Sequence, residues 1–189
     1  MKILYIDTET TGANPRGHDA HDVVQIAAII EIDGVVVDRI ELKCAPHFPD
    51  HYEPEALSVT GVTIEELCLR PDPTETYKKF TAFLHKHRNK YDKTDRFFFV
   101  AYNAPFDFQV MIEHAKRSGD EWFMTNFWSP PICVMVLAAN ALMPVRHTLT
   151  NFKLQTICAF CEIEFDKDAA HDALYDLGRT VELYKKLTS

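Results

Sequence analysis

The sequence predicts an α/β fold, one mixed sheet with helices packed on it. Three strand-like segments come first, over residues 2–10, 23–30 and 35–44, and Asp33-Gly34 between the last two is typical of a hairpin turn. Farther along, one short apolar run, Phe97–Ala101, lies among segments with helical periodicity. Strands first, then strand and helices in alternation, indicate an antiparallel meander that continues into a mixed sheet.

Helices are expected where apolar residues recur at helical spacing or where capping residues begin a turn. They are predicted at residues 55–60, ended by Gly61, in a short turn capped by Thr63, and at residues 73–89, 105–118, 134–143, 149–160 and 170–187. Residues 13–22 and 46–54 are polar or proline-containing and are expected to be loops. Neither an internal repeat nor a linker divides the chain, so a single domain is expected over residues 1–189.

Length and composition are those of a globular protein. The 189 residues can bury a sizeable core, and apolar runs stay well short of the roughly 20 residues of a membrane span. The chain begins directly with a strand, so no secretory signal is expected. Five cysteines without a disulfide-like spacing fit a reducing compartment. We therefore expect a cytoplasmic protein without membrane contact.

The formal net charge of -8 bears on which kinds of nucleic-acid-binding protein this chain could be. Proteins that coat long stretches of nucleic acid depend on many lysine and arginine contacts to phosphates, and this composition argues against them. A protein that grips only the end of a nucleic-acid chain through bound metal ions is still compatible with the charge.

The first strand ends with two acids at alternate positions, Asp7 and Glu9. Side chains two apart on a strand point to the same face, so these carboxylates are expected side by side. Like charges this close raise each other's pKa unless a cation neutralises them. Hard divalent cations such as Mg²⁺ and Mn²⁺ prefer carboxylate oxygens. The pair indicates half of a metal site, and the alternative is a strand end where both acids are simply hydrated.

A further acid, Asp107, follows the strand at Phe97–Ala101. Pro105 opens a helix, and Asp107 falls in its first turn. Open α/β sheets bind ligands in crevices at such strand–helix junctions. An acid in a first turn also stabilises the helix through its dipole, by roughly 0.3–1 kcal/mol. Both interpretations stay open for this residue taken alone.

The third candidate segment lies at the start of the last predicted helix. Asp172 and Asp176 are four residues apart and share a helix face, next to the apolar stripe. His171 lies at or just before the helix start, where its side chain could lean over a cleft. Taken alone, it could equally be a helix-start residue without a chemical role.

Taken together, Asp7–Gly12, Asn103–Asp107 and His171–Asp176 resemble, in order and spacing, the three motifs of the DEDDh exonucleases. These are the proofreading branch of the ribonuclease H-like superfamily. The resemblance covers nearly the whole chain: Pro54–Leu57 with Gly61–Thr63 is similar to the family's segment between the first two motifs, and the C-terminal part is especially similar to ribonuclease T. It implies a ribonuclease H-like fold with a five-stranded mixed sheet, antiparallel in its first three strands, and helices on both faces.

The resemblance also assigns roles to the residues already marked. Two divalent metal ions, Mg²⁺ or Mn²⁺, would be held by four carboxylates: Asp7, Glu9, Asp107 and Asp176. His171 would act as general base on the attacking water. Asp176, not Asp172, is the implied ligand, because the family spaces its histidine and aspartate as His171 and Asp176 are spaced. Asp172 is left as a helix cap or a residue behind the ligands.

The same resemblance implies a site for the 3′-terminal nucleotide. Its walls would be Thr10, Thr11 and Ala13 on one side and Val59 and Thr60 on the other, with Asn103 and Phe106 near sugar and base. Apolar and aromatic surfaces of this kind hold a base by stacking without reading sequence. Two positions depart from the family pattern. Ala13 is smaller than the bulky apolar residue often found there, and Gln25 stands where a glutamate is common.

The predicted function is a metal-dependent 3′→5′ exonuclease, a phosphodiester hydrolase that releases mononucleotides from single-stranded 3′ ends, with DNA slightly favoured. A ribonuclease T-like exoribonuclease that recognises the 2′-OH is the alternative within the enzyme class. A catalytically silent module that binds 3′ ends is the alternative of another class. Expected partners are single-stranded DNA or RNA 3′ ends, with a homodimer and a polymerase or repair partner left open.

The pair Cys158 and Cys161 has the spacing of a metal or redox motif. A structural zinc site needs about four ligands, and neither a second such pair nor paired histidines accompany this one. The pair also lies on a predicted amphipathic helix rather than at a strand–helix junction. Packing in the core is therefore the expected role.

Overall fold

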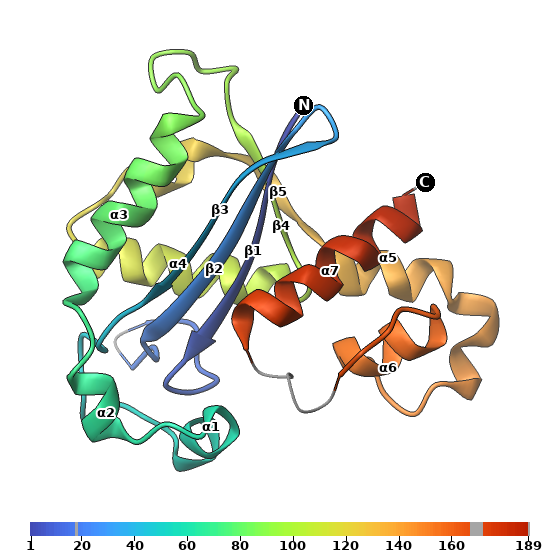
Figure 1. The fold of residues 1–189 in the computed structure, drawn as a ribbon, viewed down its shortest axis with the longest axis horizontal. Coiled ribbons are helices and arrows are strands. Elements are labelled where there is room, and N and C mark those ends of the chain that lie inside the picture. Colours follow the sequence, from blue (N-terminus) through green and yellow to red (C-terminus); the bar gives the residue numbers. More distant parts are fainter. Residues whose placement is uncertain (18, 167–171, 189) are drawn as a thin grey trace.

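The computed structural model describes residues 1–17, 19–166 and 172–188, and of residues 59 and 60 only the backbone. Its centre is a five-stranded sheet with strand order β3-β2-β1-β4-β5 (Figure 1). The middle strand, β1 (Lys2–Thr10), is antiparallel to β2 (Val23–Ile32) and parallel to β4 (Phe97–Ala101). The edges are β3 (Val35–Lys43) and β5 (Phe127–Cys133). The predicted mixed sheet, antiparallel over its first three strands, is confirmed.

The turn between β2 and β3 forms as predicted. Asp33 and Gly34 have φ angles of 50° and 85°, both in the left-handed region. Two consecutive residues with positive φ match the right-handed twist of the flanking strands, which is why Asp-Gly favours this hairpin.

The strand that was not located along the sequence is β5. It contains Pro130 and Pro131, which cannot donate hydrogen bonds to a neighbouring strand. Such a segment is tolerated at the edge of a sheet, and β5 pairs on one side only, with β4, through a register shift between Phe98 and Val100.

The helices begin and end close to the predicted boundaries. They are α1 (Pro54–Thr60), α2 (Ile64–Cys68), α3 (Pro73–Lys86), α4 (Ala104–Arg117), α5 (Val134–Ala141), α6 (Leu154–Phe160) and α7 (Ala173–Thr188), with short 3₁₀ helices η1 (Phe123–Asn126) and η2 (Met143–Thr148). Gly61 ends α1 at φ 67°, and Thr63 caps α2 through a reciprocal pair of hydrogen bonds with Glu66.

Helix α6 begins five residues later than predicted. The side-chain oxygen of Asn151 accepts hydrogen bonds from the Lys153 backbone N–H (2.9 Å) and the Thr156 hydroxyl (2.7 Å). An asparagine that binds the backbone locally offers the chain an alternative to the helix, so the helix begins only beyond it.

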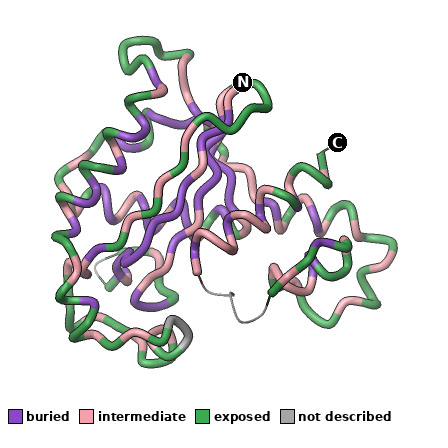
Figure 2. Tube along the Cα trace, viewed as in Figure 1, coloured by how far each residue is buried: buried purple, intermediate pink, exposed green. Residues whose placement is uncertain are grey.

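Two hydrophobic cores lie on opposite faces of the sheet. Helices α3 and α4 cover one face, where Phe80, Phe99 and Phe108 are buried; α5, α6 and α7 cover the other, with Tyr5 and Leu177. Figure 2 shows the buried residues concentrated along the central strands. The prediction of helices on both faces is confirmed.

All five cysteines are free thiols. Cys158 is fully buried in the core beneath α7, and Cys161 directly follows α6, half-buried against the same core. The predicted packing role fits both positions.

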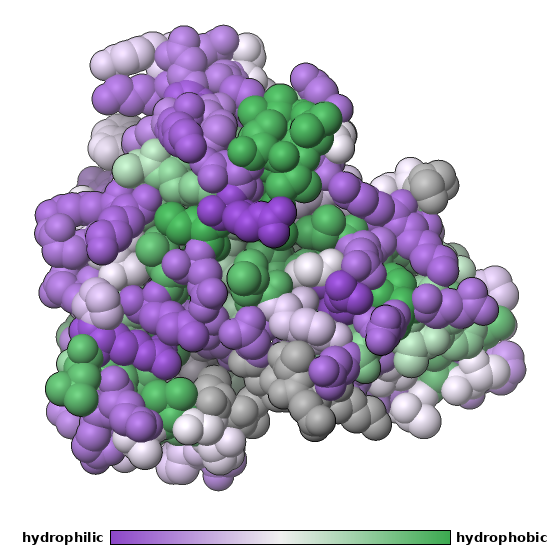
Figure 3. All heavy atoms as spheres, viewed as in Figure 1, coloured by the Kyte–Doolittle hydropathy of each residue, from purple (hydrophilic) through white to green (hydrophobic). Residues whose placement is uncertain are grey.

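The face seen in Figure 3 is largely hydrophilic, with an apolar patch over the end of the β2–β3 hairpin. Val35, Val36 and Val37 are the exposed apolar residues at the start of β3. Within the described part of the chain, no helix is both long and apolar enough to cross a membrane.

Candidate active site

The geometry of the site follows from the unequal lengths of two neighbouring strands. β4 pairs with β1 from Ile3 to Tyr5 and ends at Ala101, whereas β1 continues to Thr10. Asp7 and Glu9 therefore lie beyond the end of β4 and pair only with β2. The chain turns from β4 into α4 at this point, so the start of that helix meets the free side of β1.

Asp107, in the first turn of α4, is held against β1 by hydrogen bonds. Its Oδ1 accepts from the Thr8 backbone N–H (3.1 Å) and the Thr8 hydroxyl (2.8 Å), and the side chain is only 5% exposed. Thr8 therefore fixes one candidate ligand relative to Asp7 and Glu9 on either side of it. Thr8 is not among the predicted site residues, because the period of two predicts only that it faces away from these acids.

The fourth acid, Asp176, comes from α7, which packs on the same face of the sheet as Tyr5. Asp172 caps this helix, since its Oδ1 accepts hydrogen bonds from the backbone N–H groups of Leu174 (3.1 Å) and Tyr175 (3.0 Å). The backbone N–H of Asp176 donates to the Asp172 carbonyl (3.0 Å), which sets Asp176 in the first turn. Of the two roles predicted for Asp172, the structure assigns the helix cap.

The acids from these three elements are close enough to repel one another. Burial, followed by repulsion from Asp107 and Glu9 and then from the two aspartates of α7, raises the pKa of Asp7 well above its usual range. Burial and repulsion from Asp176, Asp107 and Asp172 raise the pKa of Glu9 to about 8. Burial raises the pKa of Asp107 to about 7, although the Thr8 hydrogen bonds act in the opposite direction. Asp7 and Glu9 thus lie within electrostatic range of both Asp107 and Asp176, and the predicted role of these four acids as metal ligands stays a prediction.

This donor set fits divalent cations by its chemistry. Carboxylates that repel each other at a partly closed site are stabilised by a hard cation, and their oxygens are its preferred ligands. As they stand, no three His, Cys, Asp or Glu side chains in the described part of the chain form a ready ligand group. Ion binding would therefore require the carboxylates to turn toward a common point.

A hollow of about 310 Å³ opens beside the acids. Of the residues predicted to bind the terminal nucleotide, Thr10, Ala13 and Phe106 line it, together with Glu9. Its far side is formed by residues that precede or begin α1: Glu53, Glu55 and Ala56. Glu53 was not predicted, and the only sequence signal was its place just before the family-like segment at Pro54.

Gly12 allows a close approach on the near side of this hollow. A Cβ at this position would lie 2.5 Å from the His21 ring, so any larger residue would displace that histidine. His21 Nδ1 accepts a hydrogen bond from the Asn14 backbone N–H (2.9 Å), which fixes the loop after β1.

Other predicted residues are not on the lining of the hollow. Thr11 is fully buried behind it, and Asn103 is exposed at the start of α4. His171 and the side chains of Val59 and Thr60 lie outside the described residues, so their predicted roles stay predictions. Gln25, opposite Glu9 in the β1–β2 pair, is buried and donates to Glu41 (3.1 Å).

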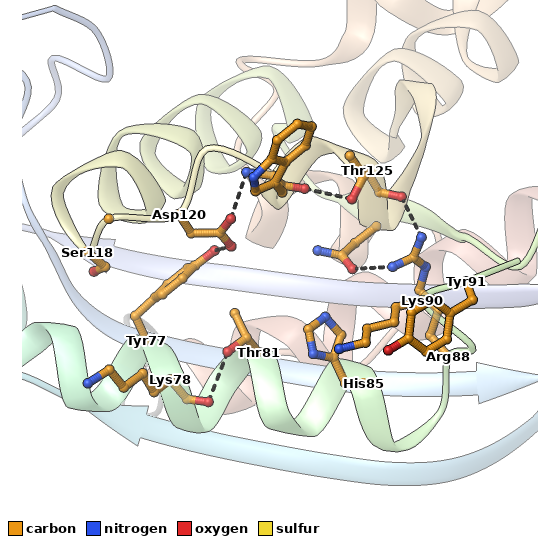
Figure 4. A pocket seen from close by; sticks show the side chains of 13 residues that line it. Tyr77, Lys78, Thr81, His85, Arg88, Lys90, Tyr91, Ser118, Asp120 and Thr125 are labelled. Carbon is orange, nitrogen blue, oxygen red and sulfur yellow. Dashed lines mark hydrogen bonds between the residues drawn. The ribbon is translucent and has the colours of Figure 1, made fainter. Parts of the chain in front are cut away.

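A second hollow, of about 490 Å³, lies between α3 and the segment after α4 (Figure 4). Several polar groups in it already bind each other. Asp120 accepts from the Tyr77 hydroxyl (2.6 Å) and the Trp122 backbone (2.7 Å), and Arg88 donates to Asn126 (2.9 Å) and Thr125 (2.9 Å). These hydrogen bonds join α3 and the residues after it to the segment that follows α4. The polar groups of the second hollow therefore bind each other, whereas the acids at the first hollow repel one another.

Residues 4–184 match the model of a family described as exonuclease. The chain belongs to this exonuclease family. A ribonuclease T from Shewanella frigidimarina is 29% identical over 192 residues, covering 96% of this chain and 79% of that protein. A PolC-type DNA polymerase III from Bacillus cereus is 31% identical over 185 residues, but these cover only 11% of the polymerase and 97% of this chain.

Solved structures of exonuclease I share the fold. The structure of the E. coli enzyme in complex with a dT13 oligonucleotide matches the whole chain with a TM-score of 0.77 at 20% identity. The match covers only 41% of the exonuclease I chain. These likenesses confirm the predicted ribonuclease H-like fold. The family model confirms the prediction of an exonuclease, which is a phosphodiester hydrolase.

Proposed function

We propose that this exonuclease removes mononucleotides from single-stranded 3′ ends, using two divalent metal ions and a histidine base. The observation that carries the proposal is the gathering of four acids from β1, α4 and α7 beside a hollow that holds an aromatic ring. A binding module would have no need for buried, mutually repelling carboxylates, whose charge costs stability unless a cation compensates it.

The chain's own residues divide the work. Asp7, Glu9, Asp107 and Asp176 would hold the ions, and Thr8 keeps Asp107 in place through two hydrogen bonds. When bound, divalent ions stabilise the charge that develops on the phosphodiester. His171, five residues before Asp176, would take the proton of the attacking water.

The hollow beside the acids would receive the terminal nucleotide. Phe106 offers a ring against which a base can stack, and Thr10 and Ala13 line the same hollow. Thr11 is fully buried and could act only by holding the residues that line the hollow, whereas the predicted contributions of Val59, Thr60 and Asn103 remain part of this proposal. A stacking surface accepts any base, which suits an enzyme that shortens a strand one nucleotide after another.

DNA is the proposed substrate. The relative with 31% identity is a DNA polymerase, and the exonuclease I neighbour was solved with a DNA oligonucleotide. RNA is the second candidate, because the ribonuclease T relative aligns over 79% of its own length. Recognition of the 2′-OH would separate the two.

The test uses 5′-labelled DNA and RNA oligonucleotides of one sequence, incubated with Mg²⁺ and in parallel with a chelator. We expect a ladder that shortens from the 3′ end, with DNA cleaved faster, and no ladder with chelator. A faster ladder on RNA would favour the ribonuclease T-like alternative. A protein that retards both oligonucleotides in a gel without shortening either would be the silent binding module.

A further inference from the structure

We propose that a buried ion pair between Asp22 and Arg117 positions two walls of the hollow beside the acids. The near wall is the loop after β1, at Gly12 and Ala13, and the far wall is the segment at Glu53–Ala56. Asp22 would thus be a positioning residue for the terminal nucleotide. The inference rests on the proposed function for the meaning of that hollow. It concerns a network of contacts that lies apart from the four acids.

Asp22 lies just before β2 and is only 1% exposed. Its Oδ1 accepts a hydrogen bond from Arg117 Nη1 (2.5 Å), and its Oδ2 accepts one from the Phe48 backbone N–H (2.7 Å). Both carboxylate oxygens are thus used, one by the end of a helix and one by the segment between β3 and α1. Charge-assisted bonds of this kind are stronger than neutral ones.

Arg117, the last residue of α4, reaches both segments. Its Nη2 donates to the Ala20 carbonyl (2.8 Å), and its guanidinium lies 4.8 Å from the centre of the Phe48 ring. One rigid, planar group therefore holds the loop after β1 and the segment before α1 at the same time. A lysine could supply the charge but not this pair of directed donors.

The network continues from Asp22 to the hollow through Thr11. The Thr11 N–H donates to the Asp22 carbonyl (2.9 Å), and the Asp22 N–H donates to the Thr11 hydroxyl (2.9 Å). That hydroxyl donates to the His51 carbonyl (2.9 Å), and the Thr11 carbonyl accepts from the Glu53 N–H (2.7 Å). The near wall and the far wall are thereby joined behind the hollow.

The walls also meet directly at the hollow. Ala13, on the near side, donates its backbone N–H to Glu53 Oε2 (3.0 Å) on the far side. Ala13 lies two positions after Thr11, and Glu53 lies two positions after His51. Loss of the Asp22 carboxylate would leave the Phe48 N–H without its acceptor and the Arg117 charge without its partner, so both walls would loosen.

The catalytic acids are held by different contacts, chiefly the Thr8 bonds to Asp107. A looser hollow should therefore weaken binding of the strand end while turnover at saturation is preserved. A general loss of folding would instead lower the active fraction, which reduces kcat and leaves KM unchanged.

The experiment compares Asp22→Asn with the wild type and with Glu31→Gln in steady-state cleavage of an oligonucleotide. Glu31 is a matched control, because its carboxylate is also buried and paired (2.7 Å to Lys185 Nζ), but it lies opposite Ile3 near the start of β1. For Asp22→Asn we expect KM to rise about tenfold, equivalent to about 1.4 kcal/mol of binding free energy, with kcat nearly unchanged. Arg117→Lys should raise KM less than Arg117→Met does.

The same proteins are compared by amide hydrogen exchange. Exchange at the Phe48 and Glu53 amides should be faster in Asp22→Asn than in the wild type, and unchanged in Glu31→Gln. An unchanged KM, or a loss confined to kcat, would overturn the inference. Should the wild type shorten no oligonucleotide, the proposed function fails, and the exchange comparison alone decides whether Asp22 orders the two walls: unaltered exchange at Phe48 and Glu53 would reject it.

Discussion

The two ends of helix α4 treat a buried aspartate in opposite ways. At its last residue, Arg117 pairs with Asp22, and both carboxylate oxygens of Asp22 accept directed hydrogen bonds. In its first turn, Asp107 is nearly as buried, yet its charged neighbours are Asp7 and Glu9 of β1. About ten residues, or roughly 15 Å along the helix axis, separate the two arrangements.

The pairing of Asp22 with Arg117 stabilises the fold, whereas the burial of Asp107 next to other acids destabilises it. Unpaired buried charge is destabilising, and a group's environment decides whether it stays charged. This chain compensates Asp22 with a guanidinium but buries Asp107 next to the like charges of Asp7 and Glu9. We interpret the second arrangement as a site whose compensation comes from bound cations.

The largest expected effect is a difference in kcat between variants of the two aspartates. Asp107→Asn removes a candidate ligand and should lower kcat by on the order of 10³, since a metal ion stabilises the transition state by several kcal/mol. Asp22→Asn should leave kcat nearly unchanged. Steady-state kinetics on a labelled oligonucleotide measures both, and equal losses of kcat in the two variants would remove the distinction.

His171→Ala tests the proposed general base, which belongs to the same site as Asp107. Loss of a general base typically lowers the rate by roughly 10²–10⁴, while the carboxylates still hold the ions. Single-turnover cleavage and Mn²⁺ titration should therefore diverge. If Mn²⁺ affinity falls as far as turnover does, His171 acts at the metal site and not on the water.

Stability as a function of pH should sharpen the contrast. In the folded protein Asp107 and Glu9 keep their protons to about pH 7 and 8, whereas unfolded acids lose them near pH 4. The folded state thus binds more protons between these values, and the free energy of unfolding should fall as pH rises through this window. We expect a loss of several kcal/mol between pH 5 and 9 in chelator, since each pKa unit of such a shift corresponds to about 1.36 kcal/mol.

Urea unfolding in chelator measures this loss, and the variants provide the controls. Glu9→Gln and Asp107→Asn should flatten the pH dependence and stabilise the protein at pH 9. Asp22→Asn should instead destabilise it, by up to about 3 kcal/mol, because it strands the Arg117 charge. A wild-type stability that does not decline above pH 5 would mean that the acids do not repel each other as described.

The smallest expected effect concerns Thr8. Thr8→Val removes the hydroxyl bond to Asp107 but keeps the backbone bond, and a single hydrogen bond contributes about 1 kcal/mol. The acid limb of the rate–pH profile should move to higher pH, since the hydroxyl bond lowers the pKa of Asp107. An unshifted profile would show that the hydroxyl does not act on the catalytic acid.

Much of this arrangement could be predicted from the sequence, because it depends on local patterns. The Asp33-Gly34 turn, the Thr63 cap and the first-turn position of Asp107 all follow from backbone preferences that neighbouring residues determine. The alternate spacing of Asp7 and Glu9 predicts that their side chains share one face of the strand.

Contacts between distant segments could not be predicted in this way. Thr8 binds Asp107 across 99 residues, and Asp22 binds Arg117 across 95. Nothing in the residues around Glu53 indicates that it meets Ala13. The position of β5 could not be predicted because Pro130 and Pro131 are unfavourable in strands, and only the edge of the sheet tolerates them. The sequence therefore predicts the acids but not what holds them in place.

The most direct test of the account is Mn²⁺ binding, measured by calorimetry at pH 8 on the wild type and on Asp107→Asn. We predict that the wild type binds two ions and releases protons on binding, because burial and repulsion raise the pKa of Glu9 to about 8, so that part of this carboxyl is still protonated at this pH. Asp107→Asn should lose at least one ion and bind the rest more weakly. No binding to the wild type at millimolar Mn²⁺, or identical binding to both proteins, would contradict the assignment of these acids as the metal site.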